Sequence, residues 1–147
     1  MGHSSQPYWH CPPPMPVERK RQPANNPLPK EGDEEILFNY YTDRSDLTEV
    51  QIPETVKAIG SEAFMNCTSL VSVNVPKSVD HMAGYVFTNC TSLKTATIPA
   101  MRTAGPRMFL GCSALEEVNF DSDLRHIEIF CGCSSLKTIN LSENLKE

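Results

Sequence analysis

The chain has 147 residues, 39% of them hydrophobic, which is enough for one domain with a buried core. It holds 18 acidic and 13 basic residues, so its formal net charge at pH 7 is −5. This charge gives no electrostatic attraction for nucleic acid or for an anionic membrane surface, and no stretch is long and apolar enough to span a bilayer. We therefore expect neither a nucleic-acid partner nor a membrane span.

Residues 1–32 form the first region, which is rich in proline and poor in aliphatic residues. Such a segment cannot bury enough surface to offset the entropy of ordering it, so we expect a disordered or polyproline-like arm. The arm is either a flexible tail or leader, or an extended segment that docks in a groove on a partner. The candidate docking residues of the arm are Tyr8, Trp9, Arg19, Lys20 and Arg21.

The same region lacks the apolar core of about 7–15 residues that a secretory leader requires. We therefore expect an intracellular protein, or a cell-surface protein if the N-terminus of the sequence is incomplete.

Residues 33–147 are predicted to form one domain, in which residues 33–46 cap the N-terminal end. Aromatic and branched residues dominate residues 34–41, which favours a strand that turns back onto the segment beginning at Leu47. A short helix with Asp33 as its N-cap is the alternative.

A repeat occupies the rest of the chain, with leading leucines at positions 47, 70, 93, 115 and 136. A fixed period of this length is typical of a solenoid. Each unit begins with the pattern Leu-x-x-apolar-x-apolar, the alternation of a short half-buried strand. Long connections between such strands imply parallel pairing, so we expect a parallel sheet of about five strands. Proline follows at positions 53, 76 and 99 and should end the strand.

The second half of each unit carries apolar residues that should point inward from a short helical or 3₁₀ turn or from a second extended segment. Phenylalanine recurs there and should form a spine along the solenoid. The Asn-Cys or Gly-Cys step that follows should turn the chain, because Asn and Gly tolerate left-handed backbone. The recurring residues are Phe64, Phe87, Phe109 and Phe130, and Cys67, Cys90, Cys112 and Cys133.

The pattern Leu-x-x-Val-x-Ile-Pro-x-x-Val-x-x-Ile-Gly-x-x-Ala-Phe-x-x-Cys-x-Ser is almost complete in residues 47–69. It resembles the BspA-type class of leucine-rich repeats, with four in-register copies over about 100 of the residues. Later units depart from it, since Asp121 replaces proline and two units are shorter. The resemblance implies a curved solenoid used for protein binding. It is a family common on the surfaces of some bacteria and anaerobic protozoa, without known catalysis.

The cysteine column at the repeat period is interpreted as buried free thiols that act as small hydrophobes, although stacked cysteines could also approach disulfide distance. Cys131 and Cys133 are only two positions apart, which does not fit the usual zinc spacing. The sequence shows no set of residues for nucleophilic catalysis and no glycine-rich phosphate loop. We expect no metal, no cofactor and no enzymatic activity.

The outward side of the strands is the predicted partner-binding surface, which we call the strand face; the alternative is an ordinary solvated face. At the C-terminal edge the charged residues 143–147 blunt the last strand, or the edge is a docking site open to homo-oligomers, or the chain is a fragment. The function predicted is a non-catalytic interaction scaffold, an accessory or structural subunit of a larger assembly, with a cell-surface adhesin as the alternative. The strand-face residues are Glu49, Gln51, Ser72, Asn74, Lys94, Thr97, Glu117, Asn119, Lys137 and Asn140.

Overall fold

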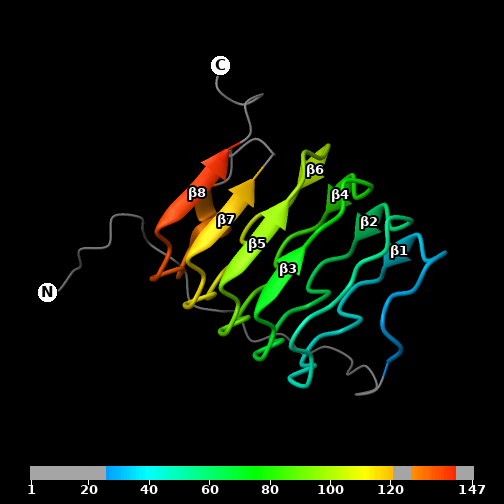
Figure 1. The fold of residues 1–147 in the computed structure, drawn as a ribbon, viewed down its shortest axis with the longest axis horizontal. Coiled ribbons are helices and arrows are strands. Elements are labelled where there is room, and N and C mark those ends of the chain that lie inside the picture. The colour runs from blue at the N-terminus through cyan, green and yellow to red at the C-terminus, as the bar shows by residue number, and fades with distance from the viewer. Residues whose placement is uncertain (1–25, 121–126, 142–147) are drawn as a thin grey trace, which may run out of the picture.

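The computed structural model describes residues 26–120 and 127–141, and these wind into a solenoid of parallel strands (Figure 1). Each turn of the solenoid is called a row here: row 0 is residues 33–46, and rows 1 to 5 begin at residues 47, 70, 93, 115 and 136. Rows stack along one axis and contribute strands to two separate sheets. The predicted repeat solenoid is confirmed.

Sheet B is the predicted sheet. It contains, in order, β3 (Ser72–Asn74), β5 (Thr95–Ile98), β7 (Glu117–Phe120) and β8 (Thr138–Leu141), all parallel. Four of the five predicted strands are formed. The row 1 segment, residues 47–52, is not a strand but lies beside β3, where the Val71 amide donates to the Thr48 carbonyl over 3.0 Å.

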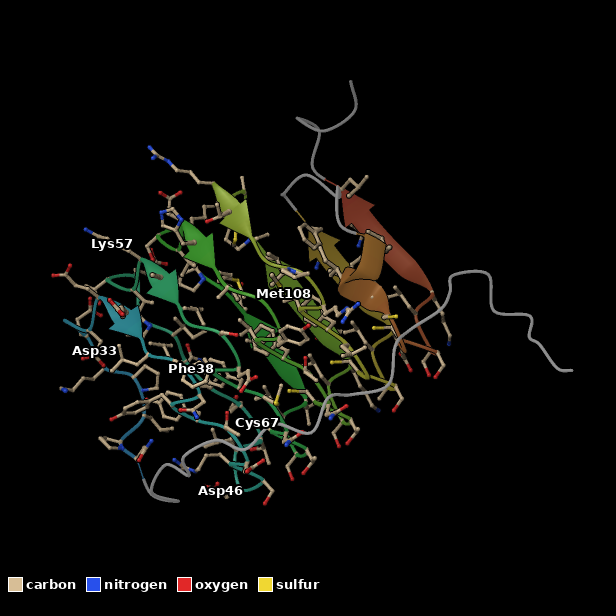
Figure 2. All side chains as sticks on the ribbon, turned by 180° about the vertical axis from the view of Figure 1, so that it is seen from behind. Asp33, Phe38, Asp46, Lys57, Cys67 and Met108 are labelled. Atoms are coloured by element: carbon tan, nitrogen blue, oxygen red, sulfur yellow. The ribbon has the colours of Figure 1, made fainter. Side chains whose placement is uncertain are left out.

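Sheet A comes from the second halves of the rows. Its two-residue strands are β1 (Glu35–Ile36), β2 (Ala58–Ile59), β4 (His81–Met82) and β6 (Thr103–Ala104), again all parallel. Figure 2 shows these short strands side by side, seen from behind. Row 4 instead has a 3₁₀ helix, η1 (Ile127–Phe130), so both alternatives left open by the sequence occur.

The segment before Leu47 does not turn back onto residues 47–52 as predicted. β1 pairs in parallel with β2, with Ile36 in register with Ile59. Ile36 fills the same buried column as Ile59 and Met82, so residues 33–46 behave as the second half of a repeat. The place of Ile36 in this buried column therefore explains why β1 pairs with β2 and not with residues 47–52.

A column of stacked aromatic rings forms the centre of the fold. Tyr41 and Phe64 have ring centroids 5.3 Å apart, and the following pairs along the column are separated by 5.6, 5.5 and 5.9 Å, with rings within 14° of parallel. The predicted spine Phe64, Phe87, Phe109 and Phe130 is confirmed, and Tyr41 extends it into row 0.

The cysteine column runs beside the rings as free thiols. Each thiol donates a hydrogen bond to the carbonyl of the aromatic residue in the preceding row. The Cys90 thiol reaches the Phe64 carbonyl over 3.2 Å, and the Cys112 thiol reaches that of Phe87 over 3.0 Å. The backbone amides of the ring residues bind in the opposite direction, as when Phe64 donates to the Val86 carbonyl over 2.9 Å.

The turns of rows 0 to 3 contain left-handed residues at two points each. The Asn-Gly column has positive φ at Asn66, Asn89, Gly111 and Gly132, as the sequence predicts. The second column was not predicted because its residues share no chemistry: Asn39, Glu62, Tyr85 and Arg107 all have φ between 47° and 64°. Within the described residues, no helix is long and apolar enough to cross a membrane.

Candidate functional site

The strand face lies on sheet B, and all ten of its predicted residues have side chains at least partly exposed to solvent. Strand register aligns six of those in rows 2 to 5 into two columns, because Ser72 pairs with Thr95 and Asn74 with Thr97 on β3 and β5. Lys94 and Lys137 lie one residue before β5 and β8, outside these columns. The columns continue through Glu117 and Asn119 to β8. The structure thus brings the predicted strand-face residues that lie on β3, β5, β7 and β8 together on one surface.

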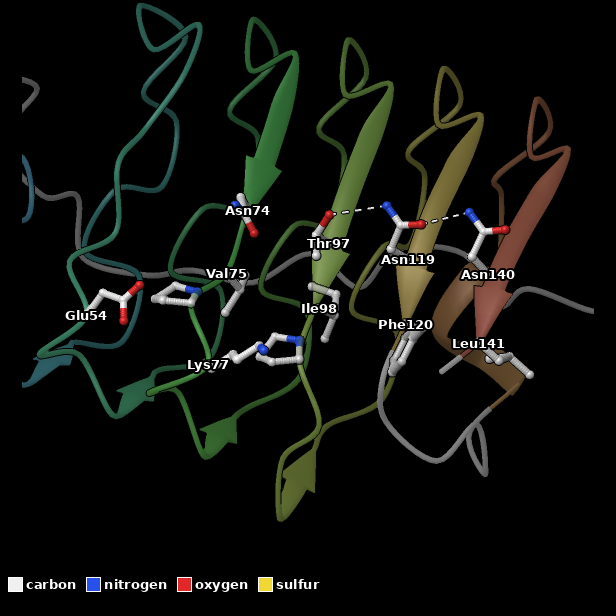
Figure 3. A pocket seen from close by; sticks show the side chains of 12 residues that line it. Glu54, Asn74, Val75, Lys77, Thr97, Ile98, Asn119, Phe120, Asn140 and Leu141 are labelled. Atoms are coloured by element: carbon white, nitrogen blue, oxygen red, sulfur yellow. Dashed lines mark hydrogen bonds between the residues drawn. The ribbon is translucent and has the colours of Figure 1, made fainter. Parts of the chain in front are cut away.

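Side-chain amides link the outer strands into a ladder. Asn140 Nδ2 donates to Asn119 Oδ1 over 2.7 Å, and Asn119 Nδ2 donates to Thr97 Oγ1 over 3.3 Å (Figure 3). Asn140 Nδ2 also reaches Glu117 Oε2 over 2.9 Å. These bonds orient the amides of rows 4 and 5, whereas no hydrogen bond to another described side chain holds the Asn74 amide in row 2.

A groove runs across the strands where each one ends. It consists of two hollows of about 630 and 510 Å³ that share Glu54, Asn74 and Pro76, so together they form one continuous depression, the strand groove. Its long axis follows the solenoid axis, from Pro29 in the N-terminal hollow to Leu141 in the other. Figure 3 shows the column formed by Asn74, Thr97, Asn119 and Asn140 on one side of the groove, with Glu54 and Lys77 on the other side.

Charge is unevenly distributed along the strand groove. The N-terminal hollow contains three carboxylates, Glu31, Glu49 and Glu54, and none of them forms an ion pair with another described residue. The Lys30 ammonium in the same hollow lies 3.7 Å from the Asp33 carboxylate. The other hollow adds a single new charge, Lys77. The groove is therefore acidic at its N-terminal end and nearly neutral beyond.

The N-terminal end of the solenoid is covered by residues just before row 0. The Tyr41 hydroxyl donates to the Pro27 carbonyl over 2.6 Å, and Arg44 Nη1 donates to the Asn26 carbonyl over 3.0 Å. The other two nitrogens of Arg44 bind Asp46 at 2.7 and 2.8 Å. This bidentate pair raises the pKa of Arg44 and lowers that of Asp46, and burial raises the pKa of Tyr41 to about 12.

The thiol column has the chemistry of a packed core and not of a reactive site. Burial raises the pKa of Cys133 to about 12 and also raises the pKa of Cys67 and of Cys112. Since the thiolate is the nucleophile and the metal ligand, these buried thiols stay protonated and inert. Among the described residues no group of three or more His, Cys, Asp or Glu side chains could hold a metal ion.

One exposed cluster on sheet A combines residue types found in catalytic sites. His81 Nδ1 lies 2.5 Å from Thr103 Oγ1, while His81 Nε2 is 3.9 Å from Asp80 Oδ2, beyond hydrogen-bond distance. The same carboxylate oxygen lies 3.4 Å from Arg102 Nε. Neither hollow of the strand groove includes this cluster.

The predicted arm residues Tyr8, Trp9, Arg19, Lys20 and Arg21 lie outside the described residues. Sequence reasoning missed the contribution of Pro29, Lys30 and Glu31 to the groove, because it assigned them to the arm. The proline at position 29 and the charges beside it gave no periodic signal that could have placed them there.

The family model described as BspA type Leucine rich repeat region (6 copies) matches residues 34–147. The chain belongs to the BspA-type leucine-rich repeat family. Leucine-rich repeats of this kind serve generally in protein binding and are generally non-enzymatic. The match begins in row 0, in agreement with the structure, where residues 33–46 already follow the repeat.

Two solved structures resemble this leucine-rich repeat domain. One is a leucine rich cell surface protein from Faecalibacterium prausnitzii, with 26% sequence identity, a TM-score of 0.67 and coverage of 77% of this chain and 31% of the other. The second is the T. pallidum leucine rich repeat protein, with 20% identity, a TM-score of 0.56 and coverage of 78% and 66%. This chain thus spans less than two thirds of either protein. No curated protein matches its sequence significantly.

Proposed function

We propose that this leucine-rich repeat domain is a non-catalytic interaction scaffold, an accessory or structural subunit that docks onto a larger protein assembly through its strand face and its N-terminal arm. The observation that supports the strand face is its regular register: polar side chains from successive rows line one continuous groove. A polar, shallow surface of this kind suits recognition of a protein partner better than binding of a small molecule, which usually fills an apolar cavity.

Site-specific photo-crosslinking in source cells tests the strand face. A benzophenone amino acid replaces Lys94, an exposed strand-face residue, and the matched control replaces Lys57, an exposed residue beside sheet A that Figure 2 labels. We expect one discrete adduct, identified by mass spectrometry, from the Lys94 position and not from the Lys57 position. Equal or absent adducts at both positions would remove the strand face from the proposal.

The arm is tested in the full-length chain by replacing Tyr8, Trp9, Arg19, Lys20 and Arg21 together with serine. Loss of the strand-face adduct in this variant supports docking through both regions. An undiminished adduct assigns binding to the strand face alone.

A cell-surface adhesin is the second candidate function, favoured by the likeness to the F. prausnitzii cell surface protein. Intact source cells treated with a protease discriminate the two locations. Digestion of the protein on intact cells supports the adhesin, whereas protection until lysis supports the intracellular scaffold.

The C-terminal edge is a further proposed contact, open to a second copy of the chain. Among described residues, all four side chains of β8 are exposed, and Ile139 and Leu141 are 39% and 44% exposed although they continue core columns. Light scattering after size exclusion tests it: Ile139→Lys should convert a dimer to a monomer. A wild-type chain that is monomeric at high concentration contradicts this contact.

A further inference from the structure

We propose that the strand groove binds an extended, proline-containing peptide segment of its partner, with basic residues at the end that lies over Glu49 and Glu54. This inference rests on the proposed function of the strand face and adds the chemistry of the bound segment. It follows from the shape of the groove floor, from the spacing of the rows and from the distribution of charge.

The groove floor excludes a docked helix. An amphipathic helix needs an exposed apolar stripe, but the floor residues Val75, Ile98 and Phe120 are all at least 98% buried. Leu141, at the C-terminal end, is the one large apolar groove residue among those described that is substantially exposed. Strand addition is excluded as well, because the groove crosses the face of sheet B and not its edge.

What the groove offers instead is polar groups at regular intervals along its axis. One residue per row faces the groove from the amide side, namely Gln51, Asn74, Thr97, Asn119 and Asn140. Asn140 already donates to Glu117 and Asn119. The amides of Gln51 and Asn74, which no hydrogen bond to another described side chain holds, can donate to the main chain of a segment that has no internal hydrogen bonds. A polyproline II segment meets this condition, since its backbone carbonyls are fully available.

The spacing of the rows also matches this conformation. Parallel strands lie about 4.7–4.9 Å apart, so two rows rise about 9.4–9.8 Å. Three residues of polyproline II, one full turn, rise about 9.3 Å. Every third residue of the segment would therefore meet an equivalent part of the groove. The four intervals from Gln51 to Asn140 correspond to about six residues of the segment.

The distribution of charge along the groove determines which end of the bound segment carries basic residues. The carboxylates of Glu31, Glu49 and Glu54 sit in the N-terminal hollow without an ion pair to another described residue, so a basic side chain there gains attraction without breaking an existing contact. Lys77 in the other hollow disfavours a second basic residue in the C-terminal half. The bound segment is therefore basic at one end only.

The test uses the full chain and four fluorescein-labelled octapeptides, measured by fluorescence polarisation. The first carries Arg-Lys before three Pro-Ala pairs, and the second has the reverse order. The third replaces Arg-Lys with Glu-Glu, and the fourth replaces each proline with glycine. We expect binding of one of the two basic orders, weaker binding of the glycine peptide, the weakest binding of the acidic peptide, and affinity that falls with salt.

Variants place the binding in the groove. Glu49→Gln with Glu54→Gln should weaken the basic peptide about four- to 25-fold, since each exposed ion pair contributes about two- to fivefold. Asn74→Ala should weaken it about two- to tenfold by removing a hydrogen-bonding amide. The matched control Glu116→Gln changes an exposed glutamate outside both hollows and should leave affinity unchanged. NMR shifts of the Asn74 side-chain amide provide an independent readout.

Equal binding of the acidic and basic peptides, or unchanged affinity in the Glu49→Gln, Glu54→Gln variant, overturns the inference. If the Lys94 crosslink is obtained but no octapeptide binds, this inference fails while the proposed function stands. If neither is observed, both fail. Peptide binding without a Lys94 adduct supports the groove chemistry and removes the assembly role.

Discussion

The two ends of the solenoid continue the same columns with different chemistry. In row 0 the ring column ends in Tyr41 and the thiol column position is held by Arg44, and the polar tips of both reach carbonyls of Asn26 and Pro27. In row 5, Ile139 and Leu141 keep the apolar residues of the repeat and are partly exposed. The comparison teaches that the end of a solenoid can be covered when its last side chains keep their place in the stacked columns and also carry a polar group that forms hydrogen bonds to the covering segment.

The largest loss of stability is expected when a ring in the middle of the ring column is removed, compared with removal of the ring at its C-terminal end. Phe87→Ala removes a fully buried ring stacked on both sides and should lower the free energy of unfolding by about 3–5 kcal/mol. Phe130→Ala, at a partly buried ring stacked on Phe109, should cost clearly less. Urea unfolding followed by circular dichroism measures both. Equal losses would mean that the last ring is covered as well as the middle one.

The second-largest effect is expected from alkaline pH, which should lower the free energy of unfolding through the buried thiols. Thiols ionise near pH 8.5 in an unfolded chain, whereas burial raises the pKa of folded Cys133 to about 12. The folded state then holds protons that the unfolded state releases. The resulting stability is fully present below about pH 8.5 and is lost as pH rises toward 12, at about 1.4 kcal/mol per pH unit for each such thiol. Urea unfolding at several pH values in reducing buffer should show this slope.

Cys67→Ala is the matching variant, because burial also raises the pKa of Cys67. This variant should reduce the slope of the free energy of unfolding against pH by the contribution of one thiol, whatever its effect on stability at neutral pH. A slope identical to that of the wild type would show that Cys67 ionises in the folded state.

The N-terminal closure is predicted to depend more on Arg44 than on Tyr41. Arg44→Met removes the guanidinium of a residue that is 8% exposed and leaves the Asn26 carbonyl without its donor, at a cost of about 1.5–3 kcal/mol. Tyr41→Phe keeps the stacked ring and removes only the bond to Pro27, at a cost of about 0.5–1.5 kcal/mol. Thermal unfolding compares the two, and a larger loss in Tyr41→Phe would reverse this ranking.

The smallest effect is expected at the exposed end. At a protein concentration at which the chain is monomeric, Ile139→Thr should change the free energy of unfolding by less than about 0.5 kcal/mol, since surface changes rarely do more. Val118→Thr, in the same column but fully buried on β7, should cost about 1–3 kcal/mol because its hydroxyl is buried. A large loss in Ile139→Thr would show that this edge is covered in solution.

The sequence predicted those parts of the fold in which residue identity repeats. Leucine, phenylalanine and cysteine recur at the period, so the sheet, the ring spine and the thiol column could be derived. Row 0 could not, because Tyr41 and Arg44 replace the repeating residues and hide the register. Alternation also predicted which polar residues lie on the strand face, but not that Asn119 and Asn140 bind neighbouring side chains while Asn74 does not.

The opposed hydrogen bonds between rows have a mechanical consequence. A backbone amide of Phe64 points to the next row and the thiol of Cys90 points back, so detaching one row breaks both kinds of bond at once. Pulled along its axis, the domain should release rows one at a time, starting from row 5, where the described residues show no polar closure like that of row 0. Each row of about 22 residues would add at most about 73–79 Å of chain length. Such a domain would lengthen in steps under tension while its remaining rows stay folded.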